Sequence, residues 1–407
     1  MTELNASTEQ RPLTVLGWAA FLACSWTWCI GMFLPVILLR DYGPFAWVAF
    51  ALPNVVGAAA MGWVLYRPGV SEEQVARHSP AMTAFSIVTI LFHVLFFGWV
   101  VRWLGGWTFV AIAAGAAIVA FPLLLSRRTA LVLSVLVWIG SLAAFIVAVY
   151  TTNQVTPPAG SASLDLAYLV PAFIVGFALC PYLDLTFHRA RQALSSYGAV
   201  AGFTLGFGVL FLVMIVFTLW YGPMLIPPDA VGDTATPRSL PAIAAIAVLA
   251  HLVGQGGFTV AAHGVEVARR LQRRLPGVGW GTFAGFVFGG AIVAAAFYYA
   301  ERQFYYRQLS ATEIGYRLFM SFYGLIAPAY VWLFLTPWRG GMRSTPGQRW
   351  AVYVATLLLA GPAFWMGFIE RQMVWVPAGV AVILLSKVVL ETLITRNSRT
   401  TSTTDAF

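Results

Sequence analysis

Long apolar stretches alternate with short polar segments along almost the whole chain. Each stretch is about 20 residues long, the length that an α-helix needs to cross the hydrocarbon core of a bilayer. The segments between them contain proline, glycine and charged residues, which are typical of loops. The pattern predicts about twelve membrane-spanning helices. The expected spans are residues 13–40, 44–66, 82–104, 107–126, 128–150, 164–187, 198–221, 239–268, 279–300, 314–336, 350–368 and 373–395.

The two ends of the chain depart from this pattern. Residues 1–12 lack the cationic region of a cleaved signal peptide, so we expect a short cytoplasmic segment there. Residues 396–407 are rich in serine and threonine, and we expect a disordered cytoplasmic tail. The spans leave no room for a separate soluble domain.

Composition supports an all-α integral membrane protein. The 407 residues are 60% apolar and 10% charged, whereas soluble domains carry roughly 25% charge. So few charges cannot cover a surface that faces water, so the outer surface is expected to face lipid. Cys24, Cys29 and Cys180 all lie in apolar stretches, which predicts buried free thiols rather than disulfides or a zinc site.

The arginines predict the orientation in the membrane. If the N-terminus is inside, sixteen arginines fall on inner segments and seven on outer ones, and Lys387 lies in the last span. Basic residues favour the cytoplasmic side. Both termini are therefore expected in the cytoplasm, in a multi-pass inner (plasma) membrane protein. This distribution also explains the net charge of +9 without a nucleic-acid partner.

Two spans carry residues that interrupt helices. Gly31 and Pro35 lie within the first span, and Pro171, Gly176 and Pro181 within the sixth. Broken helices are tolerated in a membrane where they are buried in protein or line a cavity. Glycine and proline also serve close helix packing in membrane proteins. The functional interpretation is that both spans are broken near the middle of the membrane.

The spacing of the two breaks predicts an internal repeat. The interrupted spans are five apart and run in opposite directions if both termini are inside. This is typical of an inverted repeat of five plus five helices, with a substrate site between the half-helices. The repeats would be residues 13–150 and 164–336, followed by two additional spans in residues 350–395.

The eighth span carries a polar stripe. His251, Gln255, Thr259 and His263 recur every four residues, and Glu266 follows. At about 100° per residue, each four-residue step drifts by only about 40°, so these side chains share one face. A polar face turned to lipid would be costly, so we expect it to face the protein interior or a water-filled path.

Further polar residues lie near the middle of their spans, among them Asn54 and His93. His93 could equally be a hydrogen-bonding group between helices, and Gln255, flanked by glycines, could brace a close crossing. Asp184 lies beside His188 and two arginines, which favours a solvated ion pair.

Two short stretches carry a family resemblance. Residues 28–35 (WCIGMFLP) and 52–62 (LPNVVGAAAMG) are similar to the first two core helices of sodium:solute symporters. With the span count and the paired breaks, the chain resembles the LeuT fold of the amino acid–polyamine–cation superfamily. Nucleobase–cation symporters are the second resemblance.

The resemblance implies a sodium site. In such families a sodium ion lies between backbone carbonyls at the break of the first core helix and hydroxyls of the eighth. Carried over, these are the carbonyls of Cys29, Ile30 and Gly31 with Thr259, where this chain has one hydroxyl instead of the usual Ser/Thr pair. Proton coupling through His263 and Glu266, or no coupling, remain alternatives.

We therefore expect a secondary active transporter that works by alternating access, with no cofactor beyond a coupling Na⁺ or H⁺. The absence of charge at mid-membrane favours a small neutral or zwitterionic solute. The expected substrate-binding residues are Trp28, Gly31, Asn54, His93, Gly176 and Gln255.

Three other functions remain alternatives. A major-facilitator transporter also has about twelve spans, but it usually has a long central loop. An intramembrane transferase would need an acid–histidine pair such as His263 with Glu266, and an enzyme is not our expectation. A membrane sensor built on a transporter scaffold would usually carry a soluble output domain.

Overall fold

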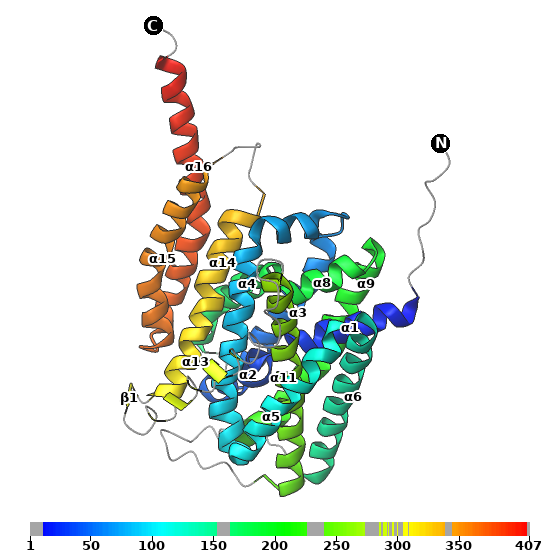
Figure 1. The fold of residues 1–407 in the computed structure, drawn as a ribbon. Helices are drawn as coiled ribbons and strands as arrows, with labels where there is room; N and C mark the ends of the chain where they lie inside the picture. Colours follow the sequence, from blue (N-terminus) through cyan, green and yellow to red (C-terminus); the bar gives the residue numbers. More distant parts are fainter. Residues whose placement is uncertain are drawn as a thin grey trace, which may run out of the picture.

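The computed structural model describes residues 11–152, 163–225, 240–272, 304–307, 309–337 and 344–404, with isolated positions between 285 and 299; side chains of residues 393–404 are not described. Nearly all of this part is helical (Figure 1). The first half contains α1 (Pro12–Trp26), α2 (Cys29–Tyr42), α3 (Phe45–Val64), α4 (Val70–Phe96), η1 (Phe97–Val101), α5 (Arg102–Leu125), α6 (Arg127–Thr151), α7 (Leu164–Leu179), η2 (Cys180–Leu183), α8 (Leu185–Ala193), α9 (Ser196–Leu205), η3 (Gly206–Phe211) and α10 (Leu212–Leu225).

The second half adds a long central helix, a small hairpin and the C-terminal helices. These are α11 (Ala242–Gln272), β1 (Tyr305–Tyr306), β2 (Leu309–Ser310), α13 (Ala311–Ser321), η4 (Phe322–Ile326), α14 (Ala327–Tyr330), η5 (Val331–Leu335), α15 (Pro346–Phe368), η7 (Met373–Trp375) and α16 (Val376–Thr404). The two strands pair antiparallel, with Tyr305 opposite Ser310.

The helices have the lengths expected of a multi-pass membrane protein. Within the described ranges, nine helices are long and apolar enough to cross a membrane, or ten if the bent pair of α1 and α2 is one span. The expected third and fourth spans lie in one 56-residue helical stretch, Val70–Leu125. Gly106 interrupts that stretch with a φ of 71°, a conformation that favours glycine. The expected span at 279–300 lies mostly outside the described residues.

The central helix of the bundle is α11, which packs against α4, α5 and α6. In its most apolar stretch 72% of the residues are buried, against 22% in α6. Large apolar side chains on the outer helices remain exposed, such as Leu136 on α6 and Leu358 on α15, at 59% and 71%. Since burying such side chains away from water is favourable, this surface fits a lipid environment.

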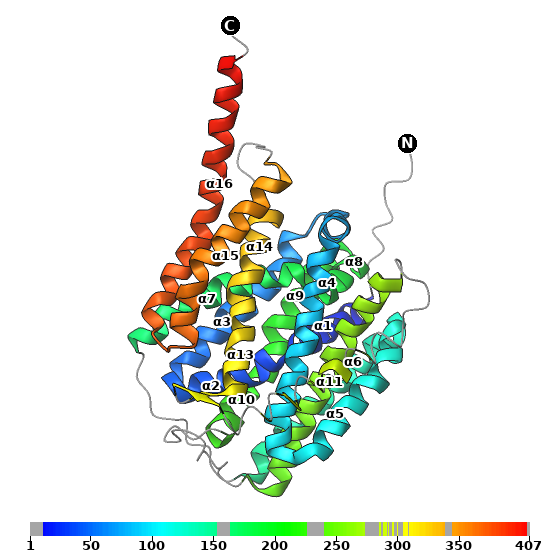
Figure 2. The same cartoon turned by 60° about the vertical axis from the view of Figure 1, so that its left-hand side comes forward.

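The last two helices form a separate pair. Helices α15 and α16 lie side by side at the edge of the bundle opposite α5 and α6 (Figures 1 and 2). The Nζ of Lys387 on α16 donates to the hydroxyl of Thr336 and the carbonyl of Pro337, both at 2.7 Å, beyond the end of η5. The charge of the only lysine is therefore placed at a helix C-terminus, where cations are favourable.

The sequence predicts a disordered tail from residue 396, and the backbone of this segment is described as a continuation of α16. Helix α16 continues to Thr404, projecting beyond the other helices (Figure 2). Between Arg396 and Thr404 the sequence contains neither glycine nor proline. An existing helix extends at little cost per residue, so its polar end can stay helical.

Candidate functional site

The first expected span is broken at Trp28, three residues before Gly31, where the sequence predicts the break. Helices α1 and α2 meet at an angle of 55°. Thr27 and Trp28 leave the helical region, with ψ angles of 64° and 173°. The amide and hydroxyl of Thr27 both donate to the carbonyl of Ala23, at 3.0 and 2.8 Å. This local capping ends α1, so Gly31 and Pro35 lie inside α2 instead of marking the break.

Side chains from three other helices satisfy the backbone at this break. The amide of Cys29 donates to Nε2 of His93 on α4 at 3.3 Å. The hydroxyl of Tyr316 on α13 donates to the carbonyl of Cys29 at 2.9 Å. The hydroxyl of Thr259 on α11 donates to the carbonyl of Cys24 at 3.1 Å. Buried backbone groups without partners would cost free energy, so these contacts stabilise the break.

The sixth expected span is not broken near its middle: Leu164–Leu183 forms one span-length helical stretch, and the interruption follows it at Asp184. Helix α7 ends at Leu179, η2 follows, and Asp184 is extended before α8 begins. Gly176 lies within α7. The Oδ1 of Asp184 accepts from the amide and hydroxyl of Thr186, at 2.8 and 2.7 Å, and so caps α8. The expected solvated ion pair at Asp184 is wrong, because this residue is 0% exposed.

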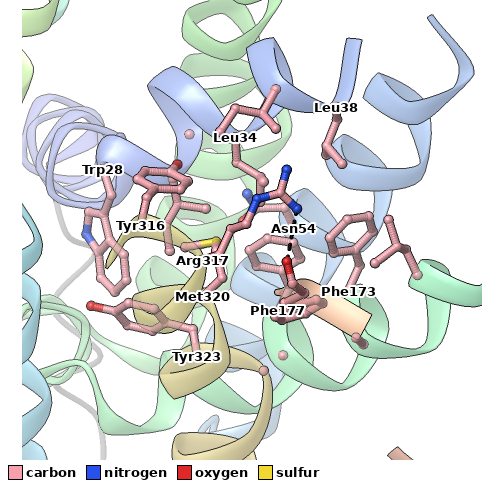
Figure 3. Close-up of a pocket in the computed structure, with 18 of the residues that line it drawn as sticks. Trp28, Leu34, Leu38, Asn54, Phe173, Phe177, Tyr316, Arg317, Met320 and Tyr323 are labelled. Carbon is pink, nitrogen blue, oxygen red and sulfur yellow. Dashed lines mark hydrogen bonds between the residues drawn. The ribbon is translucent and has the colours of Figure 1, made fainter. Parts of the chain in front are cut away.

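A pocket of about 920 Å³, part of it open to the outside, lies between α2, α3, α7 and α13. Figure 3 shows Trp28, Tyr316 and Tyr323 on one side of it and Phe173 and Phe177 on the other. The lining residues are Trp26, Trp28, Ile30, Gly31, Leu34, Ile37, Leu38, Asp41, Tyr42, Asn54, Leu169, Ala172, Phe173, Gly176, Phe177, Cys180, Tyr316, Arg317, Met320, Tyr323, Gly324, Phe368 and Met373.

Four of the six expected substrate residues line this pocket. They are Trp28, Gly31, Asn54 and Gly176, and Ile30 from the expected ion site joins them. His93 and Gln255 do not line it. Gln255 lies behind the pocket, where its Nε2 donates to Ser141 at 2.8 Å.

The inner end of the pocket carries one oriented amide. Oδ1 of Asn54 accepts from the indole nitrogen of Trp26 at 2.6 Å. The amide nitrogen of Asn54 donates to no group in the described part of the chain. The hydroxyls of Tyr316 and Tyr323 are engaged with Cys29 and Thr89. Asn54 thus presents a hydrogen-bond donor within largely aromatic and aliphatic walls.

Charged side chains close the other end of the pocket. Arg317 donates to Asp41 at 3.1 Å and to Glu313 at 2.7 Å, joining α13 to α2. Arg40 pairs with Glu313 at 2.9 Å. In the sequence, Arg40 and Arg317 count only among the seven outer arginines, and the distribution of charge does not predict this cluster. The signals were the adjacent Arg40 and Asp41 and the four-residue spacing of Glu313 and Arg317.

The polar stripe of α11 faces the protein interior, as predicted. His251, Gln255, Thr259, His263 and Glu266 are all between 0% and 4% exposed. The stripe does not line the pocket, because α1 and the break lie between them. His263 comes nearest, with its ring 5.7 Å from that of Trp28.

The expected sodium ligands are not brought together. Thr259 contacts the carbonyl of Cys24, and the carbonyl of Cys29 is occupied by Tyr316. The position of the break explains this difference. The carbonyls without helical partners are those in the last turn of α1, and not those of Cys29, Ile30 and Gly31 at the start of α2. Within the described residues no group of three or more histidine, cysteine, aspartate or glutamate side chains could hold a metal ion.

His263 and Glu266, the alternative residues for proton coupling, do not contact each other in a shared pair. Glu266 pairs with Arg269 at 3.0 Å and lies 3.7 Å from Arg189. Nδ1 of His263 is 3.1 Å from the hydroxyl of Ser86. These two side chains therefore serve different neighbours.

No family model matches this chain, and no curated protein matches it. The described residues form an α-helical membrane protein with one span broken between α1 and α2, beside a partly open pocket. The resemblance to the LeuT fold therefore stays an expectation.

Proposed function

We propose that this protein is a secondary active transporter that moves a small neutral or zwitterionic solute by alternating access. The observation that carries the proposal is the pocket beside the break between α1 and α2. Solute sites of transporters lie near the membrane midplane, where broken helices present backbone groups to a cavity. On this proposal the chain has about twelve spans, a five-plus-five inverted repeat and both termini in the cytoplasm.

The pocket wall suggests how a solute would be held. Ile30 and Gly31 lie in the first turn of α2, where amide groups lack helical partners. The positive end of the helix dipole favours a carbonyl or carboxylate oxygen there. The donor of Asn54 adds a second polar contact, while Phe173 and Tyr323 offer flat apolar surfaces. A compact solute with one polar end fits these features.

The two ends of the pocket support alternating access. Towards the predicted outer side, the ion pairs of Arg317 with Asp41 and of Arg40 with Glu313 join α13 to α2. Towards the predicted inner side, Trp26 packs on Phe187 of α8, with ring centroids 4.9 Å apart. Charged contacts can separate by small movements, whereas the aromatic packing blocks passage. The structure then corresponds to a state with a packed inner side and an outer side held by charged contacts.

The broken first span favours a transporter with a site at broken helices over a major-facilitator transporter. The major-facilitator alternative does not require a break in its first span. The transferase alternative would need an acid–histidine pair open to substrate, and His263 is 0% exposed.

Uptake by purified protein tests the proposal. The protein is reconstituted into liposomes and offered labelled neutral amino acids and pyrimidine bases, with and without sodium or proton gradients. We expect saturable uptake of at least one compound, reduced at least about tenfold by Asn54→Leu, since a lost buried contact costs about 1–3 kcal/mol. Leu52→Ala is the control, because Leu52 lies on the same helix and is 63% exposed.

Two results would contradict the proposal. One is the absence of uptake for every compound under every gradient. The other is an equal loss of uptake in Asn54→Leu and Leu52→Ala, which would show that the pocket has no particular role.

A further inference from the structure

Asp184 and His263 face each other across the centre of the protein without a hydrogen bond. Asp184 precedes α8 at the second break, and His263 belongs to the polar stripe of α11. Oδ2 of Asp184 lies 3.8 Å from Nε2 of His263, and both side chains are 0% exposed. Neither atom has a hydrogen-bond partner among the residues that the structure describes. The other atoms of both side chains are engaged, Oδ1 with Thr186 and Nδ1 with Ser86.

This arrangement is unfavourable without a proton between the two groups. A buried carboxylate oxygen with no donor costs several kcal/mol. If Nδ1 of His263 donates to Ser86, then Nε2 and Oδ2 present lone pairs to each other. One added proton removes the conflict, either as an imidazolium facing a carboxylate or as a carboxylic acid facing a neutral ring. A movement of less than about 1 Å would bring the atoms into hydrogen-bond range.

The pair also contacts both breaks. The ring of His263 packs on Trp28, which lies at the first break and lines the pocket. Asp184 caps α8, the helix whose Phe187 blocks the inner end. A proton at this position would therefore act on the solute site and on the inner closure together.

We propose that Asp184 and His263 form the proton-binding site that couples transport to the proton gradient. This rests on the proposed transport function and selects the proton instead of sodium as the coupling ion. Binding requires no other reactant: the proton arrives from water and leaves to water.

Other titratable groups surround the pair. Glu266 on α11, Cys180 on η2 and Tyr323 on η4 interact electrostatically with Asp184, and His93 on α4 does so with His263. Glu266 is neutralised by arginines, and His93 is bound to Cys29.

The nearest histidine on α8 has partners of its own. Both ring nitrogens of His188 are bonded, to Ser71 at 2.8 Å and to the carbonyl of Tyr182 at 3.0 Å. Only the facing atoms of Asp184 and His263 lack partners among these groups.

Infrared spectroscopy tests the site with protons alone. Difference spectra of the purified protein are recorded as the pH is stepped from about 4 to about 9, a range that spans the ordinary values of aspartate and histidine. We expect a carboxylic-acid carbonyl band that disappears with rising pH and is lost in Asp184→Asn. Asparagine caps helices as well as aspartate, so α8 should remain intact.

Two further variants complete the experiment. In His263→Gln the band should persist to higher pH, by about one unit or more, because an opposite charge no longer favours the carboxylate. Asp165→Asn is the control, since Asp165 is exposed at the start of α7; it should leave the buried band unchanged. Folding of each variant is checked by circular dichroism.

The proposal is overturned if the band survives in Asp184→Asn, or if the spectra respond to sodium at fixed pH and not to pH itself. These outcomes are separate from the uptake experiment. Uptake without the titrating band would leave a transporter with another coupling ion, whereas the band without uptake would leave a proton site and remove the transport function.

Discussion

Individual side chains at the first break divide between two tasks. His93 and Tyr316 satisfy the amide and carbonyl of Cys29, while Trp28 turns its ring towards the pocket. The polar residues that looked most like ligands in the sequence therefore include some that stabilise the backbone. His93 is one of the residues that stabilise the backbone, since its Nδ1 is also 2.8 Å from the carbonyl of Thr89.

A pair of substitutions at His93 tests this assignment. His93→Leu removes the acceptor for the amide of Cys29, and leaving that amide unpaired should cost about 1–3 kcal/mol. His93→Gln retains an acceptor and should lose clearly less stability. The midpoint of thermal unfolding in detergent measures the difference. Equal losses in the two variants would show that the contact with Cys29 is unimportant.

At the scale of elements, close approach of helices decides where the pocket lies. Helix α3 crosses α7 at Gly57, where an added Cβ would lie 2.3 Å from the carbonyl oxygen of Phe177. This contact brings Asn54, one turn earlier on α3, to the pocket beside Gly176. The sequence analysis placed Gly57 in the stretch of family resemblance but could not identify its partner.

Gly57→Ala should therefore destabilise the protein. Overpacking a tight contact costs about 1–3 kcal/mol, and the neighbouring atom is backbone that cannot rotate away. Gly140→Ala on α6 is the matched control, because nothing lies within 4 Å of its added Cβ. Alanine favours helix more than glycine, so the control should unfold at an equal or higher temperature. Thermal unfolding of both variants decides between these expectations.

At the scale of the whole molecule, the structure holds a second, polar cavity beside α8 that shares no lining residue with the pocket. The second cavity, of about 670 Å³ and partly open, is lined by His188, Arg189, Gln192 and Glu266 among others. On α8, Phe187 packs on Trp26 and on Phe207, with ring centroids 4.9 and 5.0 Å apart. This packing separates the proposed outer and inner openings.

Thiol labelling from one side of the membrane tests the orientation. The three native cysteines are buried, so an introduced cysteine should dominate the reaction with an impermeant maleimide. Leu34→Cys in the pocket should be labelled in intact cells, and Gln192→Cys only in inside-out vesicles. The unmodified protein is the control. The opposite pattern would reverse the proposed orientation, and labelling of Gln192→Cys in cells would contradict a closed inner side.

The apolar stretches predicted most of the helices because hydrophobicity and length are local properties of the chain. The exception within the described chain is the C-terminal tail, where helix extends through a polar sequence. Proline and glycine located the broken first span, but its break lies at Thr27 and Trp28 instead of Gly31, and in the sixth expected span the interruption lies at Asp184, beyond the span-length stretch Leu164–Leu183. Capping by Thr27 and Asp184 sets the final positions, and the competition between such contacts is not visible in the pattern.

The sequence by itself determined the membrane class, the broken first span and the burial of the polar stripe, because each follows from the cost of placing polar groups in lipid. The tertiary structure decided which polar groups meet. It joined Arg317 to Asp41, placed Asn54 on the pocket and set Asp184 against His263. These residues are far apart in the chain, and only helix packing fixes the distances between them.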